Sequence, residues 1–214
     1  MANRKLAEGM FWFQIIGAAI FAFGQGVKML TSTQGVSTAM FAASEIFCIV
    51  LLILAVAARR VSPTRITNQT MMIYITGLSI YSGLLAIMLV KGQSRWDAKD
   101  WLTSYLVVAG LVLLSMIARK QMLPFTDPMI KGGFALIMKA IPQLIMAVKI
   151  WQVGGAGIAT TFVVMFHLLT CSRILQVYLA VREIGWDRNL KGILLSESGN
   201  ELSWCIVTLA WLMR

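Results

Sequence analysis

Residues 38–58 read TAMFAASEIFCIVLLILAVAA, a run of 21 residues in which Glu45 is the one charged side chain. About 20 apolar residues are enough for an α-helix to cross the hydrocarbon core of a bilayer. The same length criterion, applied along the whole chain, finds seven such segments. They cover residues 11–30, 38–58, 70–90, 101–118, 131–151, 157–181 and 193–213. The sequence therefore predicts an all-α integral membrane protein with about seven transmembrane helices.

The composition of the whole chain favours the same class. Of its 214 residues, 58% are hydrophobic and 13% are charged, and the mean hydropathy is +0.78. Soluble domains usually carry about a quarter charged residues. Seven crossings with short connections use the whole length. We therefore expect one polytopic membrane domain over residues 1–214, surrounded by the lipid bilayer.

The positive charge of the chain indicates topology rather than nucleic-acid binding. The formal net charge is +10, but the Lys and Arg residues fall mostly between the apolar segments and not on one clustered face. Eleven of them lie on the side that holds the N-terminus, and six lie on the other side. The positive-inside rule then predicts a cytoplasmic N-terminus and, with seven spans, an external C-terminus.

The fifth and seventh segments are the least regular. Lys139 interrupts the fifth, and Glu197, Asn200 and Glu201 lie inside the seventh. If the seventh segment did not cross the membrane, six spans would remain. A related alternative is that residues 193–201 form an amphipathic turn at the membrane surface.

A weak internal repeat divides the chain into two halves. Residues 22–25 (AFGQ) match residues 140–143 (AIPQ), and the separation between later matches grows from 118 to 122 and then to 132. Chance similarity among apolar helices is the alternative. A true repeat would make residues 11–90 and 131–213 two three-helix bundles joined by a linking helix at 101–118, a layout that transporters use to build a central site.

This three-one-three layout, with Pro142-Gln143 in the fifth segment, resembles the PQ-loop superfamily, which includes SWEET sugar transporters, lysosomal amino-acid exporters and the KDEL receptor. In that family a Pro-Gln pair in the first helix of each bundle acts as a hinge for alternating access. The resemblance implies hinges at Gly24-Gln25 and Pro142-Gln143, since proline removes a helix hydrogen bond and glycine permits bending. It also implies a substrate contact at Asn200 on the last helix.

Ionisable side chains inside a bilayer are costly and mark candidate sites. Those of this chain are Glu45, Lys139, His167, Arg173, Glu197 and Glu201. In the seventh segment, i,i+3 and i,i+4 steps join Glu197, Asn200, Glu201 and Trp204 into one polar and aromatic stripe. The predicted substrate-binding residues are Asn200, Glu197, Glu201, Trp204, Glu45 and His167. The structural alternative is that these groups pair with one another solely for stability.

No chemistry of catalysis or metal binding is predicted. Cys48, Cys171 and Cys205 are isolated in apolar segments, without CxxC or Cys/His ligand spacing, and are interpreted as small apolar residues. No catalytic motif is present, and no cofactor is expected. The leading hypothesis is a transporter of a small polar solute, a sugar or an amino acid. The alternative is a non-transporting receptor or a subunit that packs against other membrane proteins. The sequence is also compatible with a homo-oligomer.

Overall fold

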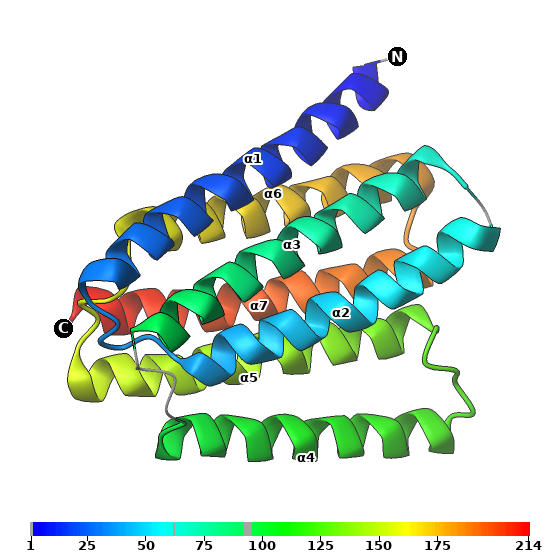
Figure 1. Cartoon of the computed structure of the whole chain (residues 1–214). Coiled ribbons are helices and arrows are strands. Elements are labelled where there is room, and N and C mark those ends of the chain that lie inside the picture. Colours follow the sequence, from blue (N-terminus) through cyan, green and yellow to red (C-terminus); the bar gives the residue numbers. More distant parts are fainter. Residues whose placement is uncertain (1, 62, 92–95) are drawn as a thin grey trace.

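A computed structural model describes the chain over residues 2–61, 63–91 and 96–214. Within these ranges it contains seven α-helices and no β-strand (Figure 1). They are α1 (Ala2–Thr31), α2 (Thr38–Val61), α3 (Arg65–Val90), α4 (Ala98–Lys120), α5 (Pro128–Val153), α6 (Thr160–Ile184) and α7 (Arg188–Leu212). The predicted all-α fold of a multi-pass membrane protein is confirmed.

Local sequence signals explain where several helices begin and end. The carboxylates of Asp97, Asp127 and Asp187 accept backbone N–H groups at the starts of α4, α5 and α7, a cap that usually contributes about 1 kcal/mol. Gly154 and Gly185 follow α5 and α6 with φ of +86° and +78°. Glycine adopts this conformation without steric cost, so the chain can turn sharply into the next helix.

Six of the described helices are long and apolar enough to cross a membrane, over residues 8–31, 38–61, 67–90, 98–120, 128–153 and 160–184. α7 is not among these six, and it carries Glu197 and Glu201. Its 25 residues give a length of about 37 Å at ~1.5 Å per residue, and it packs against both α5 and α6 (Figure 1). Residues 193–201 are therefore part of a continuous helix, and the six apolar helices among the described residues agree with the alternative of six spans.

The helices form two groups with the same order of neighbours. In the first half, α1 to α3, α3 packs against both α1 and α2; in the second half, α5 to α7, α7 packs against both α5 and α6. The halves meet where α1 contacts α6 and α2 contacts α5, and we call these two contacts together the seam. α4 lies outside, against α5 and α2 (Figure 1). Exchange of the halves by a two-fold axis would reproduce this order.

Small residues let certain helices approach closely. A Cβ on Gly132 of α5 would lie 2.4 Å from the carbonyl oxygen of Gly192 on α7, so the backbones are in direct contact there. Gly24 of α1 faces Thr161 of α6 in the same way, because a Cβ at Gly24 would overlap the threonine side chain. Small residues at helix crossings are the usual means of close packing in membranes.

Apolar side chains close the space between the halves at one end of the bundle. This end contains residues 32–37, residues 154–159 and the C-terminus, and we call it the C-terminal end (Figure 1). The largest fully buried members of its core cluster are Trp204, Phe41, Phe162, Met29, Met40 and Met88. They come from helices of both halves, so this end of the seam is tightly packed with apolar side chains.

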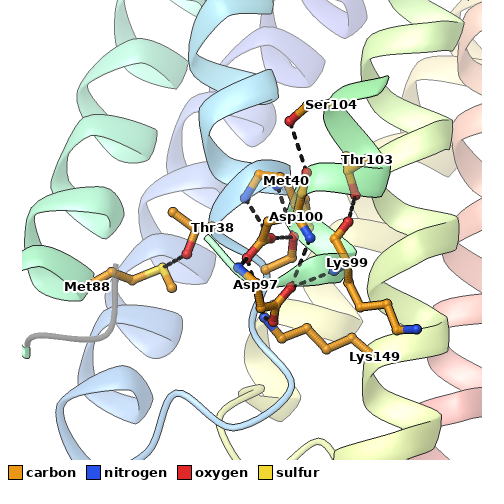
Figure 2. A network of polar contacts seen from close by, with 11 residues as sticks. Thr38, Met40, Met88, Asp97, Lys99, Asp100, Thr103, Ser104 and Lys149 are labelled. Carbon is orange, nitrogen blue, oxygen red and sulfur yellow. Dashed lines mark hydrogen bonds and ion pairs between the residues drawn. The ribbon is translucent and has the colours of Figure 1, made fainter. Parts of the chain in front are cut away.

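A charged network fixes α4 to the C-terminal end (Figure 2). Asp100, which is fully buried, accepts hydrogen bonds at Oδ1 from Ser37 Oγ at 2.8 Å and from Ala39 N at 3.0 Å. Lys149 Nζ of α5 lies 2.6 Å from Asp97 Oδ2 and 3.7 Å from Asp100 Oδ2. The network thus joins the start of α4 to the start of α2 and the end of α5.

The same contacts set the acidity of Asp97, just before α4. Partial burial acts to raise the pKa of its carboxyl, but the hydrogen bond from Lys149, the backbone N–H groups of Asp100 and Lys99 and the charge of Lys149 act in the other direction. The net effect lowers the pKa of Asp97 below its usual value. Its carboxylate therefore stays ionised beside the lysine.

Candidate functional site

An ion pair joins the central part of α5 to that of α7. Lys139 Nζ lies 2.9 Å from Glu197 Oε1, and the two side chains are 20% and 15% exposed. Lys139 also lies over the ring of Phe47 on α2, with Nζ 5.2 Å from the ring centroid. A cation is attracted to the negative face of an aromatic ring. This lysine therefore connects the second half to the first.

A carboxylate of the first half lies in the same region. Ser82 Oγ of α3 donates a hydrogen bond of 2.5 Å to Glu45 Oε1 of α2. Cys48 lies three residues after Glu45 on α2 and is within electrostatic range of both Glu45 and Lys139. The Glu45 carboxylate and the Lys139 ammonium group thus lie near one buried side chain, although they belong to different halves.

Tyr74 and Arg173 extend this polar region to α3 and α6. Tyr74 of α3 is within electrostatic range of Arg173 on α6 and of Glu197 on α7. Arg173 Nη1 donates to Gln176 Oε1 at 2.8 Å, and Gln14 Nε2 of α1 donates to the same oxygen at 3.2 Å. The polar contacts therefore reach across both parts of the seam.

We call Glu45, Tyr74, Lys139, Arg173 and Glu197 the midplane cluster. Its members come from α2, α3, α5, α6 and α7. Tyr74, Lys139, Arg173 and Glu197 lie in the central parts of their helices, and Glu45 is the eighth residue of α2. Lys139 and Glu197 form an ion pair, and the two acidic and two basic side chains of the cluster give no net formal charge. Charges persist in a low-dielectric region only where partners neutralise and solvate them. The cluster therefore combines polar side chains from both halves.

Asn200 lies in a separate network inside the second half. Its Oδ1 accepts a hydrogen bond from Gln143 Nε2 at 2.8 Å, and its Nδ2 donates to Thr170 Oγ1 at 3.1 Å. Ser203 Oγ donates to Gln143 Oε1 at 2.5 Å. Asn200, Gln143, Thr170 and Ser203 are each at most 4% exposed. This fully buried network holds α5, α6 and α7 together, and it links a predicted substrate residue to a predicted hinge residue.

The other predicted substrate residues lie nearer the C-terminal end. His167 Nδ1 of α6 lies 2.5 Å from Glu201 Oε1 of α7, and His167 Nε2 lies 2.8 Å from Thr208 Oγ1. Trp204 is completely buried and stacks on Phe166, with 4.3 Å between ring centroids. The six predicted residues thus divide. Glu45 and Glu197 join the midplane cluster, Asn200 lies in the buried network, and Trp204 lies beside the His167–Glu201 pair, with its ring centroid 6.5 Å from that of His167.

The predicted hinge residues lie in continuous helices. α1 runs through Gly24 and Gln25, and α5 runs through Pro142 and Gln143 without an interruption. Gln25 is buried and binds the connection between α5 and α6, because its Nε2 donates to Gly157 O at 2.9 Å and its Oε1 accepts from Ala159 N at 3.0 Å. In this conformation Gln25 therefore holds the two halves together at the C-terminal end.

Sequence reasoning missed some contributors to the site. Tyr74 and Gln14 resemble other residues of their segments, and no periodic pattern separates them from residues that pack against lipid. Lys139 and Arg173 are ionisable groups within the predicted spans, but the predicted substrate site does not include them. The usable signal was electrostatic, since two acidic residues inside a membrane need cationic partners.

Comparison with protein-family models, curated proteins and solved structures gave no match to this chain.

Proposed function

We propose that this membrane protein transports a small polar solute by alternating access between its two halves. The observation that carries the proposal is the midplane cluster. Charged side chains from both halves meet in the central part of the bundle, where transporters commonly place their substrate site. A rigid scaffold would gain little from such groups, because well-packed apolar residues are usually at least as stabilising as buried ion pairs.

The chemistry of the cluster favours a zwitterion, such as an amino acid, over a sugar. Lys139 and Arg173 offer cationic donors to a carboxylate, and Glu45 and Glu197 offer acceptors to an ammonium group. A zwitterion can replace the internal pairs without changing the total charge of the site. A neutral sugar would leave these charges to each other and would gain only the hydroxyl groups of Tyr74 and Ser82.

The contacts along the seam support a rocking motion. At the C-terminal end, the apolar cluster and the Gln25 hydrogen bonds join the halves and separate the midplane cluster from that side. Within the second half, the Gln143–Asn200 network ties α5, α6 and α7 into one unit. Such a unit can move as a body, and opening of the C-terminal end would require only that the contacts across the seam separate.

We also propose a relationship to the PQ-loop superfamily. The order of neighbours in the two halves and the position of Pro142-Gln143 in α5 support it. The alternative of a non-transporting subunit expects the polar stripe of α7 to face another protein. In the structure, Glu197, Asn200 and Glu201 contact α5 and α6 of the same chain, which favours transport.

The test is uptake by purified protein in sealed proteoliposomes, with radiolabelled amino acids and hexoses supplied in parallel. Glu197→Gln keeps the shape of the side chain and removes its charge. The matched control is Glu8→Gln, whose carboxylate pairs with Arg65 and is half exposed. A lost hydrogen bond to a charged group is worth about 1.5–3 kcal/mol, so we expect at least about tenfold slower amino-acid uptake in Glu197→Gln and no change in Glu8→Gln.

A second readout follows access to the site. A single cysteine at position 74, in a variant whose three native cysteines are serine, should react with a membrane-impermeant maleimide from one side of the membrane. Added solute should shift that reactivity toward the other side. Equal uptake by Glu197→Gln and wild type, or protection at position 74 that never changes, would contradict the proposal.

A further inference from the structure

Four side chains that bind metals meet between α6 and α7, away from the midplane cluster. His167 and Cys171 lie four residues apart on α6, and Glu201 and Cys205 lie four residues apart on α7. Residues with this spacing lie on the same face of a helix. Because α6 packs against α7, the two pairs face one another. The pattern is His-x-x-x-Cys opposite Glu-x-x-x-Cys.

The distances fit one small ion. His167 Nδ1 lies 2.5 Å from Glu201 Oε1, and Cys205 Sγ lies 3.9 Å from the same oxygen. Ligand atoms from His167, Glu201 and Cys205 all lie within 4.8 Å of one another. A tetrahedral zinc ion, with bonds of about 2.0–2.3 Å, holds its ligands roughly 3.3–3.8 Å apart. Small side-chain movements would therefore bring the three groups to bonding distance.

Two further features of the site point to a ligand. Glu201 Oε2 is buried and, among the described residues, has no hydrogen-bond partner. An unsatisfied carboxylate oxygen in a low-dielectric region is costly, and a cation would satisfy it. In addition, Thr208 Oγ1 bonds His167 Nε2 at 2.8 Å, so the ring is held with Nδ1 directed at Glu201. Metal-binding histidines are commonly oriented in this way.

We propose that His167, Glu201 and Cys205 bind a Zn²⁺ ion, with the Cys171 thiol beside the open fourth position. The Cys171 thiol lies beside the Glu201 carboxylate and near Cys205. The mixture of imidazole, carboxylate and thiol donors suits zinc, whereas Mg²⁺ and Ca²⁺ prefer oxygen ligands alone. The site is independent of the proposed transport activity, and a bound ion would tie α6 to α7 within the second half.

Charge balance favours this stoichiometry. The Cys205 thiolate and the Glu201 carboxylate neutralise the two positive charges of Zn²⁺, and neutral His167 adds none. The three-ligand site therefore carries no net charge, with Cys171 a thiol beside the ion and not a ligand. An uncharged assembly costs least in an apolar region. Because Cys205 must release its proton, binding should weaken as the pH falls.

The first experiment is titration of the purified full-length protein in detergent with Co²⁺, a spectroscopic substitute for Zn²⁺. We expect one ion per chain, a thiolate-to-cobalt charge-transfer band and the visible bands of a tetrahedral site, all displaced by Zn²⁺. Cys205→Ser and Glu201→Gln should lose this signal. The matched control is Cys48→Ser, because Cys48 is buried on α2 beside Glu45. This variant should bind Co²⁺ as the wild type does.

The second experiment needs no substitution and so is insensitive to misfolding of a variant. Cys171 and Cys205 are exposed, whereas Cys48 is buried. Zn²⁺ should protect Cys205 and slow the alkylation of Cys171 by N-ethylmaleimide, as read by mass spectrometry, and should leave Cys48 unchanged. Binding no greater than the detergent blank, a cobalt spectrum that persists in Cys205→Ser, or alkylation that ignores zinc would overturn the proposal.

Discussion

Replacement of Lys139 by methionine should strongly destabilise the second half, because it strands the Glu197 carboxylate. At 2.9 Å and an effective dielectric constant of about 20, the two charges attract by about 6 kcal/mol. Desolvation offsets most of this gain, and loss of one partner from a buried pair typically costs about 3–5 kcal/mol. Because the Lys139 and Glu197 side chains are still 20% and 15% exposed, we expect Lys139→Met to lower the free energy of unfolding by about 2–4 kcal/mol.

A double-mutant cycle separates the pair from its surroundings. The double variant Lys139→Met/Glu197→Gln removes both charges, so its cost should be smaller than that of Lys139→Met alone, with a coupling energy of about 1–3 kcal/mol. Glu8→Gln is the control: its pair with Arg65 is 38% and 50% exposed, and such pairs contribute less than about 1 kcal/mol.

The assay is equilibrium unfolding in mixed micelles at increasing mole fractions of a denaturing detergent, followed by circular dichroism. The fitted free energies of unfolding give the coupling energy directly. If Lys139→Met costs no more than Glu8→Gln, or if the two substitutions add independently, then the pair does not hold α5 against α7 and the reasoning about the midplane cluster is wrong.

Three other predictions concern packing, acidity and topology. Gly132→Ala should cost about 1–3 kcal/mol, since its Cβ would meet the backbone of Gly192, whereas Gly83→Ala, with open space around it, should be neutral or stabilising in the same unfolding assay. Folding lowers the pKa of the Asp97 carboxyl. The ionised carboxylate therefore contributes fully to stability above the pKa of the unfolded state, about 3.9, and this contribution is lost as the pH falls through the lower pKa of the folded state. The melting temperature should therefore fall less steeply between pH 6 and pH 3 in Asp97→Asn than in the wild type. Parallel plots of melting temperature against pH would refute this. A green fluorescent protein fused to the N-terminus should be shielded from protease added outside intact cells, whereas digestion would place the N-terminus outside.

Part of the site can be predicted from the sequence. Glu45 and Glu197 stand out because a carboxylate inside an apolar segment needs a partner, and both lie in the midplane cluster. Asn200 and Trp204 belong to the same stripe of α7, yet they turn toward α5 and α6 and are buried at 2% and 0% exposure. Helical spacing places residues on one face, but the neighbours of that face decide whether it meets a polar site or a packed core.

The three cysteines also look alike in the sequence and differ only in the folded structure. In sequence each is a small residue in an apolar segment. The structure buries Cys48 in the core and places Cys171 and Cys205 at the surface beside Glu201. The prediction that these cysteines lack a ligand spacing overlooks that Cys171 and Cys205 follow His167 and Glu201 by four residues. The meaning of this spacing depends on the contact between α6 and α7, which spacing alone does not reveal.

Sequence alone is enough to predict the class of this protein, its helical segments and the need to pair its intramembrane charges. The reason is that bilayer thickness and the cost of unsatisfied backbone groups act on each segment separately. The three-dimensional structure shows which charges meet, that α7 packs against α5 and α6, and that the halves have matching neighbours. These depend on contacts between residues more than 50 positions apart, such as Lys139 with Glu197 and Gln25 with Ala159. Only the packing of whole helices brings such residues together.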